Sequence, residues 1–216
     1  MTDSHRPQPQ PAATPELDEQ LEEVDGLVVD FDGTVVDNAK IRLSALQQAL
    51  APYGVDVDPQ WYTRNCGLPV REVIARLAGP RPLPADDIVD TSRRLLLTGP
   101  PPRLIDSTLA LLARAAVLGL PRAVASSAAG VLVHWAIDRL GLGTLLPVVV
   151  TAESVPRGKP APDAYLEAAR RIERAPARCL AVDDAPDGIT AALCAGMRVL
   201  AVRDGLLVPV PGPAPG

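Results

Sequence analysis

Short, uninterrupted apolar runs alternate with longer amphipathic stretches along this chain. Five such runs can be recognised, at 27–29, 122–125, 148–150, 180–182 and 199–202. Uninterrupted apolar runs are typical of strands buried on both faces, as in parallel sheets. Helical patterns separate these runs, at 107–119, 129–140, 161–174 and 186–196. The alternation predicts an α/β fold built on a parallel sheet.

One long interval breaks this alternation. Between residues 38 and 102 there is no strand-like run. Three helical patterns interrupted by Pro and Gly take its place, at 41–51, 69–78 and 85–97. We therefore expect a helical cap over 38–102, inserted into a core made of 23–37 and 103–210.

The two ends of the chain have little to bury. Residues 1–22 begin with a stretch rich in Pro, Gln and Thr, and residues 211–216 are mostly Pro and Gly. Segments of this composition cannot bury enough apolar surface to offset the entropy of ordering them. We expect both ends to be disordered tails.

Composition and charge restrict the class of function. The formal net charge is −5 with acids and bases interspersed, so the basic stripe of a nucleic-acid-binding protein is missing. No apolar run approaches the roughly 20 residues that a membrane span needs. The three cysteines include no Cys-x-x-Cys pair, which argues against a zinc site and fits a reducing cytoplasm. A small molecule is the expected partner.

Polar residues follow several of the apolar runs directly. In an open α/β sheet, ligands bind beyond the carboxyl ends of the strands. We expect one crevice to hold the polar groups at those ends, namely Asp30, Asp32, Ser126, Lys159, Asp183 and Asp184. Crowded carboxylates repel one another, and Mg²⁺, which prefers hard oxygen ligands, relieves that repulsion. Carboxylates, metal, ammonium and hydroxyl around one point predict a phosphoryl-transfer site.

Four segments of the chain, in order, resemble the motifs of the haloacid dehalogenase-like hydrolase superfamily. They are D-F-D-G-T at 30–34, Ser126 after A-V-A, G-K-P-A-P-D at 158–163 and D-D-A-P-D-G at 183–188. The resemblance extends from about Leu27 to Val202 and is greatest to the branch of phosphoglycolate phosphatase-like and β-phosphoglucomutase-like enzymes. It implies a Rossmann-like core with an inserted helical cap. It also implies hydrolysis of a small phosphate monoester, a sugar phosphate or a phosphoglycolate-like metabolite.

The resemblance implies chemical roles for the acidic residues. Asp30 is the nucleophile that becomes an aspartyl phosphate, and Asp32 is the general acid and base. Asp30, the backbone carbonyl of Asp32 and Asp184 ligate Mg²⁺. Asp183 supports the metal through water, at a position where the branch more often has Glu. The presence of Asp32 argues against a dehalogenase, because expelling a halide needs no acid.

Phosphate binding is implied for a second group of residues. Ser126 and Lys159 hold the phosphoryl oxygens, and Gly33 and Thr34 complete the phosphate-binding loop. Lysine occurs only twice in the chain, at Lys40 and Lys159, whereas arginine is abundant. A retained lysine indicates a need for a compact ammonium at that position.

Residues of the cap are expected to set specificity. Arg71, Arg42 and Asn38 are candidates for contacting the leaving part of the substrate, and Arg71 can equally be an ordinary residue in the first turn of a helix. A phosphomutase of the β-phosphoglucomutase type is an alternative, since it uses the same core. That pattern has a histidine soon after the first motif, where this chain has Arg42. A catalytically silent binding protein is a further alternative.

Overall fold

The computed structural model describes residues 15–66 and 68–212. Most of the two expected tails lies outside these residues. The prediction of a tail over 1–22 is wrong for its last part, because Pro15–Leu21 form helix α1. Leu21 is buried and Leu17 packs against the same core cluster. Leucines four residues apart share one face of a helix, which gives this segment an apolar stripe to bury.

A six-stranded sheet with the order β5-β4-β1-β6-β7-β8 forms the centre of the core. Its strands are β1 Gly26–Val29, β4 Arg122–Ala125, β5 Val148–Val150, β6 Cys179–Asp183, β7 Arg198–Arg203 and β8 Leu206–Val210. The first five are parallel and confirm the predicted strands. β8 is antiparallel to β7. Asp204 and Gly205 both have positive φ, as a tight hairpin turn between two strands requires.

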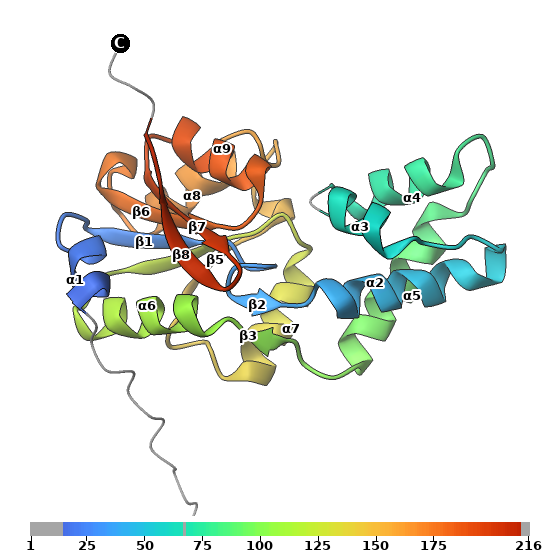
Figure 1. Cartoon of the computed structure of the whole chain (residues 1–216), viewed down its shortest axis with the longest axis horizontal. Coiled ribbons are helices and arrows are strands. Elements are labelled where there is room, and N and C mark those ends of the chain that lie inside the picture. Colours follow the sequence, from blue (N-terminus) through green and yellow to red (C-terminus); the bar gives the residue numbers. More distant parts are fainter. Residues whose placement is uncertain (1–14, 67, 213–216) are drawn as a thin grey trace, which may run out of the picture.

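Helices cover both faces of the sheet, giving three layers (Figure 1). They are α6 Asp106–Val117, α7 Gly130–Leu140, α8 Asp163–Arg171 and α9 Pro186–Cys194. α1, α6 and α7 contribute to one apolar cluster, whereas α8 and α9 contribute to the other. These bounds confirm the expected α/β architecture. No helix in the described part of the chain is long and apolar enough to cross a membrane.

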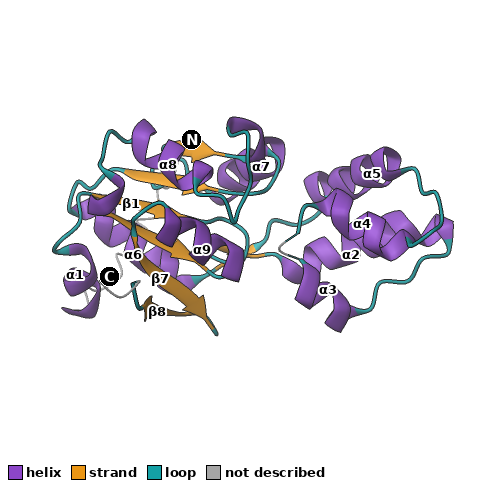
Figure 2. Cartoon of the chain, turned by 90° about the horizontal axis from the view of Figure 1, so that it is seen from above, coloured by secondary structure: helices purple, strands orange, loops and turns teal. Residues whose placement is uncertain are grey.

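The other four α-helices of the described residues form a separate helical unit beside the carboxyl ends of the strands (Figure 2). They are α2 Ala39–Leu50, α3 Pro59–Asn65, α4 Val70–Ala78 and α5 Ala85–Thr98. The unit has its own core, which includes Leu46, Ile74 and Ile88. Its two connections to the core pair as an antiparallel ribbon of β2 Val36–Asp37 and β3 Arg103–Leu104. The chain therefore enters and leaves the helical unit through one narrow neck.

Candidate active site

The sheet topology brings the ends of distant segments together. β1 lies between β4 and β6, with Val29 in register with Val124 and Val182. Asp30 comes directly after β1, and its backbone N–H donates to the Val182 carbonyl at 2.8 Å. Asp183 is the last residue of β6. Parallel strands end at one edge of the sheet, so two acids 153 positions apart become neighbours.

Lys159 bridges these two acids. Its Nζ lies 2.6 Å from Asp30 Oδ1 and 2.7 Å from Asp183 Oδ2. All three side chains are at least 91% buried, since their exposed fractions are 7%, 9% and 1%. The Tyr165 hydroxyl donates to Asp183 Oδ2 at 2.6 Å, and its ring centroid lies 5.0 Å from the Lys159 ammonium. The tyrosine therefore fixes both the carboxylate and the cation beside it.

Burial and mutual repulsion shape the titration of the acids. Burial raises the pKa of Asp30 well above its usual value, opposed by Lys159 and reinforced by Asp183 and Asp184. Burial, followed by repulsion from Asp183, likewise raises the pKa of Asp184. Burial acts to lower the pKa of Lys159, but the adjoining Asp30 and Asp183 outweigh it and the pKa is raised. The acids therefore resist ionising together, because one ammonium cannot offset all of their charges.

Asp184 is held from two sides. The Thr34 hydroxyl donates to its Oδ1 at 3.0 Å, and Arg203 donates to its backbone carbonyl. Gly33 has a φ of +88°, and a Cβ there would collide with the Asp184 carboxylate. Only glycine allows the loop after β1 to approach Asp184 this closely. Thr34 thus contacts a candidate metal ligand, and this bond gives its expected phosphate-binding role no direct support.

A divalent cation fits this donor set. Asp30, Asp183 and Asp184 each offer a carboxylate oxygen, and these oxygens all lie within 4.8 Å of one another. Lys159 supplies one positive charge against three negative ones. Carboxylate oxygens are the ligands that Mg²⁺ prefers. The Asp183 carboxylate already accepts hydrogen bonds from Lys159, from Tyr165 and from the Ala185 N–H, the last at 2.9 Å. It is therefore better suited to contact a metal ion through water than to ligate it directly.

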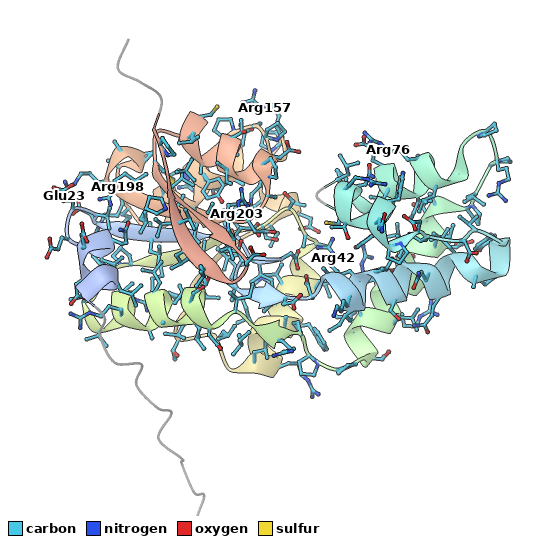
Figure 3. The ribbon with its side chains drawn as sticks, viewed as in Figure 1. Glu23, Arg42, Arg76, Arg157, Arg198 and Arg203 are labelled. Carbon is cyan, nitrogen blue, oxygen red and sulfur yellow. The ribbon has the colours of Figure 1, made fainter. Side chains whose placement is uncertain are left out.

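Asp32 is held by residues of the helical unit and its neck. Arg42 Nη1 lies 2.9 Å from Asp32 Oδ2, and Asn38 Nδ2 donates to the other carboxylate oxygen. Figure 3 shows Arg42 at the junction where α2 meets the core. Beside Asp32, the pKa of Arg42 is raised further, so the guanidinium stays charged. This ion pair connects Asp32, the expected general acid and base, to α2, the first helix of the unit.

Two adjacent serines, Ser126 and Ser127, are candidates for the phosphate-binding hydroxyl. Ser126 is buried, and its Oγ accepts the Ala128 N–H at 3.0 Å, as the residue before a helix often does. Ser127 lines the active-site cavity, and Ser126 does not belong to its lining. The sequence alone could not separate these adjacent hydroxyls. Ser127 therefore belongs to the cavity wall, whereas the Ser126 hydroxyl accepts a backbone hydrogen bond in the turn before α7.

A cavity of about 230 Å³ lies between the core and the helical unit. Asp30, Asp32, Gly33, Lys159, Asp183 and Asp184 line its core side, and Asn38 and Arg42 line its other side. Arg71 does not line it. The Arg71 side chain is 62% exposed and pairs with Asp86 on α5. The expected substrate contact from Arg71 therefore has no support in this arrangement.

Several residues of the site were not predicted. Tyr165 contacts Asp183, and Tyr62, Ser92 and Arg93 line the cavity from the helical unit. The chain has only three tyrosines, and two of them belong to this site. The scarcity of tyrosine, in a protein poor in aromatic residues, is the one feature of the sequence that could have pointed to Tyr62 and Tyr165.

Comparison with known proteins assigns most of the chain to one family. The model of the haloacid dehalogenase-like hydrolases matches residues 27–202. The Escherichia coli fructose-1-phosphate phosphatase YqaB is 30% identical over 82% of this chain and 96% of its own length. Hexitol phosphatase A of E. coli is 32% identical over 82% of each chain. CbbY from Rhodobacter sphaeroides, solved with phosphate, superposes with a TM-score of 0.73 at 27% identity, covering 82% of this chain and 84% of that one.

Proposed function

The chain belongs to the haloacid dehalogenase-like hydrolases and is a phosphoric monoester hydrolase, and on that premise we propose that it is Mg²⁺-dependent and uses Asp30 as its nucleophile. One observation carries the proposal. Lys159 lies between Asp30 and Asp183, within hydrogen-bonding distance of both, and the oxygens of Asp184 lie close by. The proposed nucleophile, the lysine ammonium and the proposed metal ligands therefore lie together in one buried site.

In the first step, the Asp30 carboxylate attacks phosphorus. The new bond joins the Asp30 oxygen to phosphorus while the bond from phosphorus to the leaving oxygen breaks. Asp32 donates its proton to that oxygen, so the alcohol leaves neutral. Lys159, at 2.6 Å from Asp30, is placed to neutralise the phosphoryl oxygens as they approach. The products of this step are the aspartyl phosphate and the free alcohol.

In the second step, water attacks the phosphorus of the aspartyl phosphate. Asp32, now a carboxylate, takes the proton from that water, and the bond between phosphorus and Asp30 breaks. Inorganic phosphate leaves, and both aspartates return to their starting forms. One residue serves as acid and then as base because the second step reverses the proton transfer of the first.

Asp30, Asp184 and the backbone carbonyl of Asp32 are the residues that would hold Mg²⁺. When bound, the metal supplies positive charge to the phosphoryl oxygens in a site where burial strengthens electrostatic interactions. Asp183 anchors Lys159 and keeps it directed at Asp30. The buried hydrogen bond from Tyr165 holds Asp183 in turn.

We assign the helical unit, over 38–102, the role of a cap that encloses the leaving part of the substrate. Its neck is the two-stranded ribbon β2–β3, a narrow connection about which a unit of this kind can move. The cavity between core and unit has a volume of about 230 Å³, which suits a small phosphorylated metabolite. Two relatives carry the names fructose-1-phosphate phosphatase YqaB and hexitol phosphatase A, and the compounds in these names are small metabolites.

A generic aryl phosphate tests the proposal. The purified protein should release inorganic phosphate from p-nitrophenyl phosphate with Mg²⁺ present. Release should stop in excess chelator and return when Mg²⁺ is restored. Asp30→Asn, prepared in the same way, controls for a contaminating phosphatase. Full activity in chelator would refute the metal claim, and equal activity of Asp30→Asn would refute the nucleophile.

A further inference from the structure

We propose that Ser92 and Arg93 of α5 set the specificity of this enzyme, and that they recognise the hydroxyl groups of a neutral leaving group, a polyol or a sugar. The inference rests on the proposed function and narrows its substrate class. It disfavours substrates whose leaving part carries a second anionic group, such as a carboxylate or another phosphate.

Ser92 is a buried hydroxyl on an otherwise apolar stripe of α5. Val89, Ser92 and Leu96 follow one another at helical spacing, and all three line the cavity. Ser92 is only 6% exposed, and within the described part of the chain no hydrogen bond involves its hydroxyl. Buried hydroxyl groups nearly always have a partner. A ligand in the cavity can supply that partner.

Arg93 follows Ser92 in the helix and also lines the cavity. Its side chain is 37% exposed, and Nη1 lies 3.1 Å from Asp90 on the same helix. This contact occupies one N–H of the guanidinium and leaves the others able to donate. A serine hydroxyl can both donate and accept. The two residues together can therefore bind hydroxyl groups, which need donors as well as acceptors.

The cations that the helical unit contributes to the cavity are already compensated. Among the described residues they are Arg42 and Arg93. Arg42 pairs with Asp32 at 2.9 Å, and Arg93 pairs with Asp90. Glu153, in the core segment after β5, adds another negative charge near Arg93.

This balance of charge favours a neutral leaving group. An anionic group would lose its hydration on entering the cavity and would find no cation that lacks a counter-charge on the cap side. A hydroxylated chain loses less hydration and can use the remaining N–H and O–H groups. The Tyr62 hydroxyl, beside Arg42 on the same side of the cavity, is a further group of this kind.

Three phosphates with the same five-carbon chain make the test. Ribitol 5-phosphate carries hydroxyl groups, 5-phospho-D-ribonate has a carboxylate in place of the far hydroxymethyl, and n-pentyl phosphate has neither. Their kcat/KM values are measured on the wild-type enzyme with Mg²⁺. We expect ribitol 5-phosphate to exceed each of the others by about tenfold or more, mainly through a lower KM. Equal or better turnover of either comparison substrate would overturn the proposal.

Ser92→Ala tests the buried hydroxyl. The KM for ribitol 5-phosphate should rise about fivefold, whereas the KM for n-pentyl phosphate should stay within about twofold. The matched control is Ser107→Ala on α6, which also removes a hydroxyl without a hydrogen-bond partner but lies outside the cavity lining. It should change neither KM. An unaltered KM for ribitol 5-phosphate in Ser92→Ala would contradict the assignment.

Arg93→Met tests the guanidinium while keeping most of its apolar stem. We expect the KM for ribitol 5-phosphate to rise about tenfold and that for n-pentyl phosphate to change by less than about twofold. Arg94→Met is the control, because Arg94 is the adjacent residue, is exposed and does not line the cavity. The same KM values in Arg93→Met and Arg94→Met would refute a specificity role for Arg93.

Asp90→Asn tests the neutrality of the leaving group. The change removes the carboxylate that compensates Arg93 and keeps the size of the side chain. It should raise kcat/KM for 5-phospho-D-ribonate about threefold and leave that for ribitol 5-phosphate within about twofold. Asp87→Asn, at an exposed position on the same helix outside the cavity lining, should alter neither value. Unchanged selectivity in Asp90→Asn would contradict the role given to charge compensation.

This inference and the proposed function can fail separately. Hydrolysis of p-nitrophenyl phosphate that disappears in Asp30→Asn supports the phosphatase mechanism whatever the leaving group. If such an active enzyme prefers n-pentyl phosphate or 5-phospho-D-ribonate, the specificity inference alone is refuted. If hydrolysis of p-nitrophenyl phosphate does not depend on Asp30, the proposed function is refuted.

Discussion

Lys159 Nζ lies 2.6 Å from Asp30 Oδ1, in a pair that solvent scarcely reaches. Removing the lysine would leave the carboxylates of Asp30 and Asp183 buried without a compensating charge. The pKa of Lys159 is raised above its usual 10.5, so the stabilisation is fully present at neutral pH and is lost only as the solution becomes strongly alkaline. The ammonium is therefore a structural element as well as the proposed phosphate ligand.

Lys159→Met should lower the free energy of unfolding at pH 7 by about 3–5 kcal/mol. Urea denaturation in the presence of chelator measures this without contributions from bound metal. The control is Lys40→Met, which alters the only other lysine of the chain, an exposed one, and should change stability by less than about 0.5 kcal/mol. Equal effects of the two variants would show that the buried pair contributes nothing particular to stability.

Asp30→Asn should stabilise the metal-free protein at neutral pH. Because burial raises the pKa of Asp30 above the unfolded value near 3.8, the native state binds more protons than the unfolded state between those two values. The free energy of unfolding of the wild type therefore falls as the pH rises through this range. Asn cannot ionise, so the variant does not lose free energy of unfolding in this way.

We expect Asp30→Asn to gain about 0.5–2 kcal/mol at pH 7, and the gain to vanish near pH 3. Thermal unfolding in chelator across that pH range checks both parts. Adding Mg²⁺ should raise the melting temperature of the wild type more than that of the variant. A stabilisation independent of pH would contradict the electrostatic explanation.

Asp32→Asn should slow the two chemical steps to different extents. A general acid or base typically contributes about 10²–10⁴-fold. Aryl phosphates have good leaving groups that need little protonation, so formation of the aspartyl phosphate from them should be affected less than formation from alkyl phosphates. Its hydrolysis should be slowed equally for both. Rapid-quench kinetics separates the steps, and equal first-step losses would exclude Asp32 as the acid.

Arg42 and Arg71 should behave differently when each is changed to Ala. Arg42, together with Asn38, fixes the Asp32 carboxylate, and small displacements of a catalytic group cost up to about 100-fold. We expect Arg42→Ala to lower kcat about 10- to 100-fold. Arg71→Ala should change neither kcat nor KM by more than about twofold, because Arg71 pairs with Asp86 at the surface. A raised KM in Arg71→Ala alone would return the substrate contact to Arg71.

The sheet and the acid cluster were predictable because their signals are local. An apolar run followed at once by an acid marks both a buried strand and the end at which ligands bind, as at Asp30 and Asp183. β8 was missed because Pro209 and the exposed Leu206 and Val208 obscure its pattern, although the Asp204-Gly205 turn was a signal for a hairpin. α1 was missed because its apolar stripe comprises only Leu17 and Leu21.

The features of the site that the sequence could not predict depend on tertiary packing. Whether Arg42 or Arg71 reaches the cavity depends on how α2, α4 and α5 pack, and no local pattern encodes that packing. The hydrogen bond between Tyr165 and Asp183 joins α8 to the end of β6, 18 positions along the chain. The choice between Ser126 and Ser127 depends on how the loop turns into α7.

Trapping the aspartyl phosphate tests the central claim most directly. Asp32→Asn is mixed with p-nitrophenyl phosphate and Mg²⁺ and quenched in acid, and its peptides are analysed by mass spectrometry. We predict one phosphoryl group on the peptide that contains Asp30, removable by neutral hydroxylamine and absent from the double variant Asp30→Asn, Asp32→Asn. Continued turnover without a phosphoryl group at Asp30, or a phosphoryl group on any other residue, would contradict the assignment of Asp30 as the nucleophile.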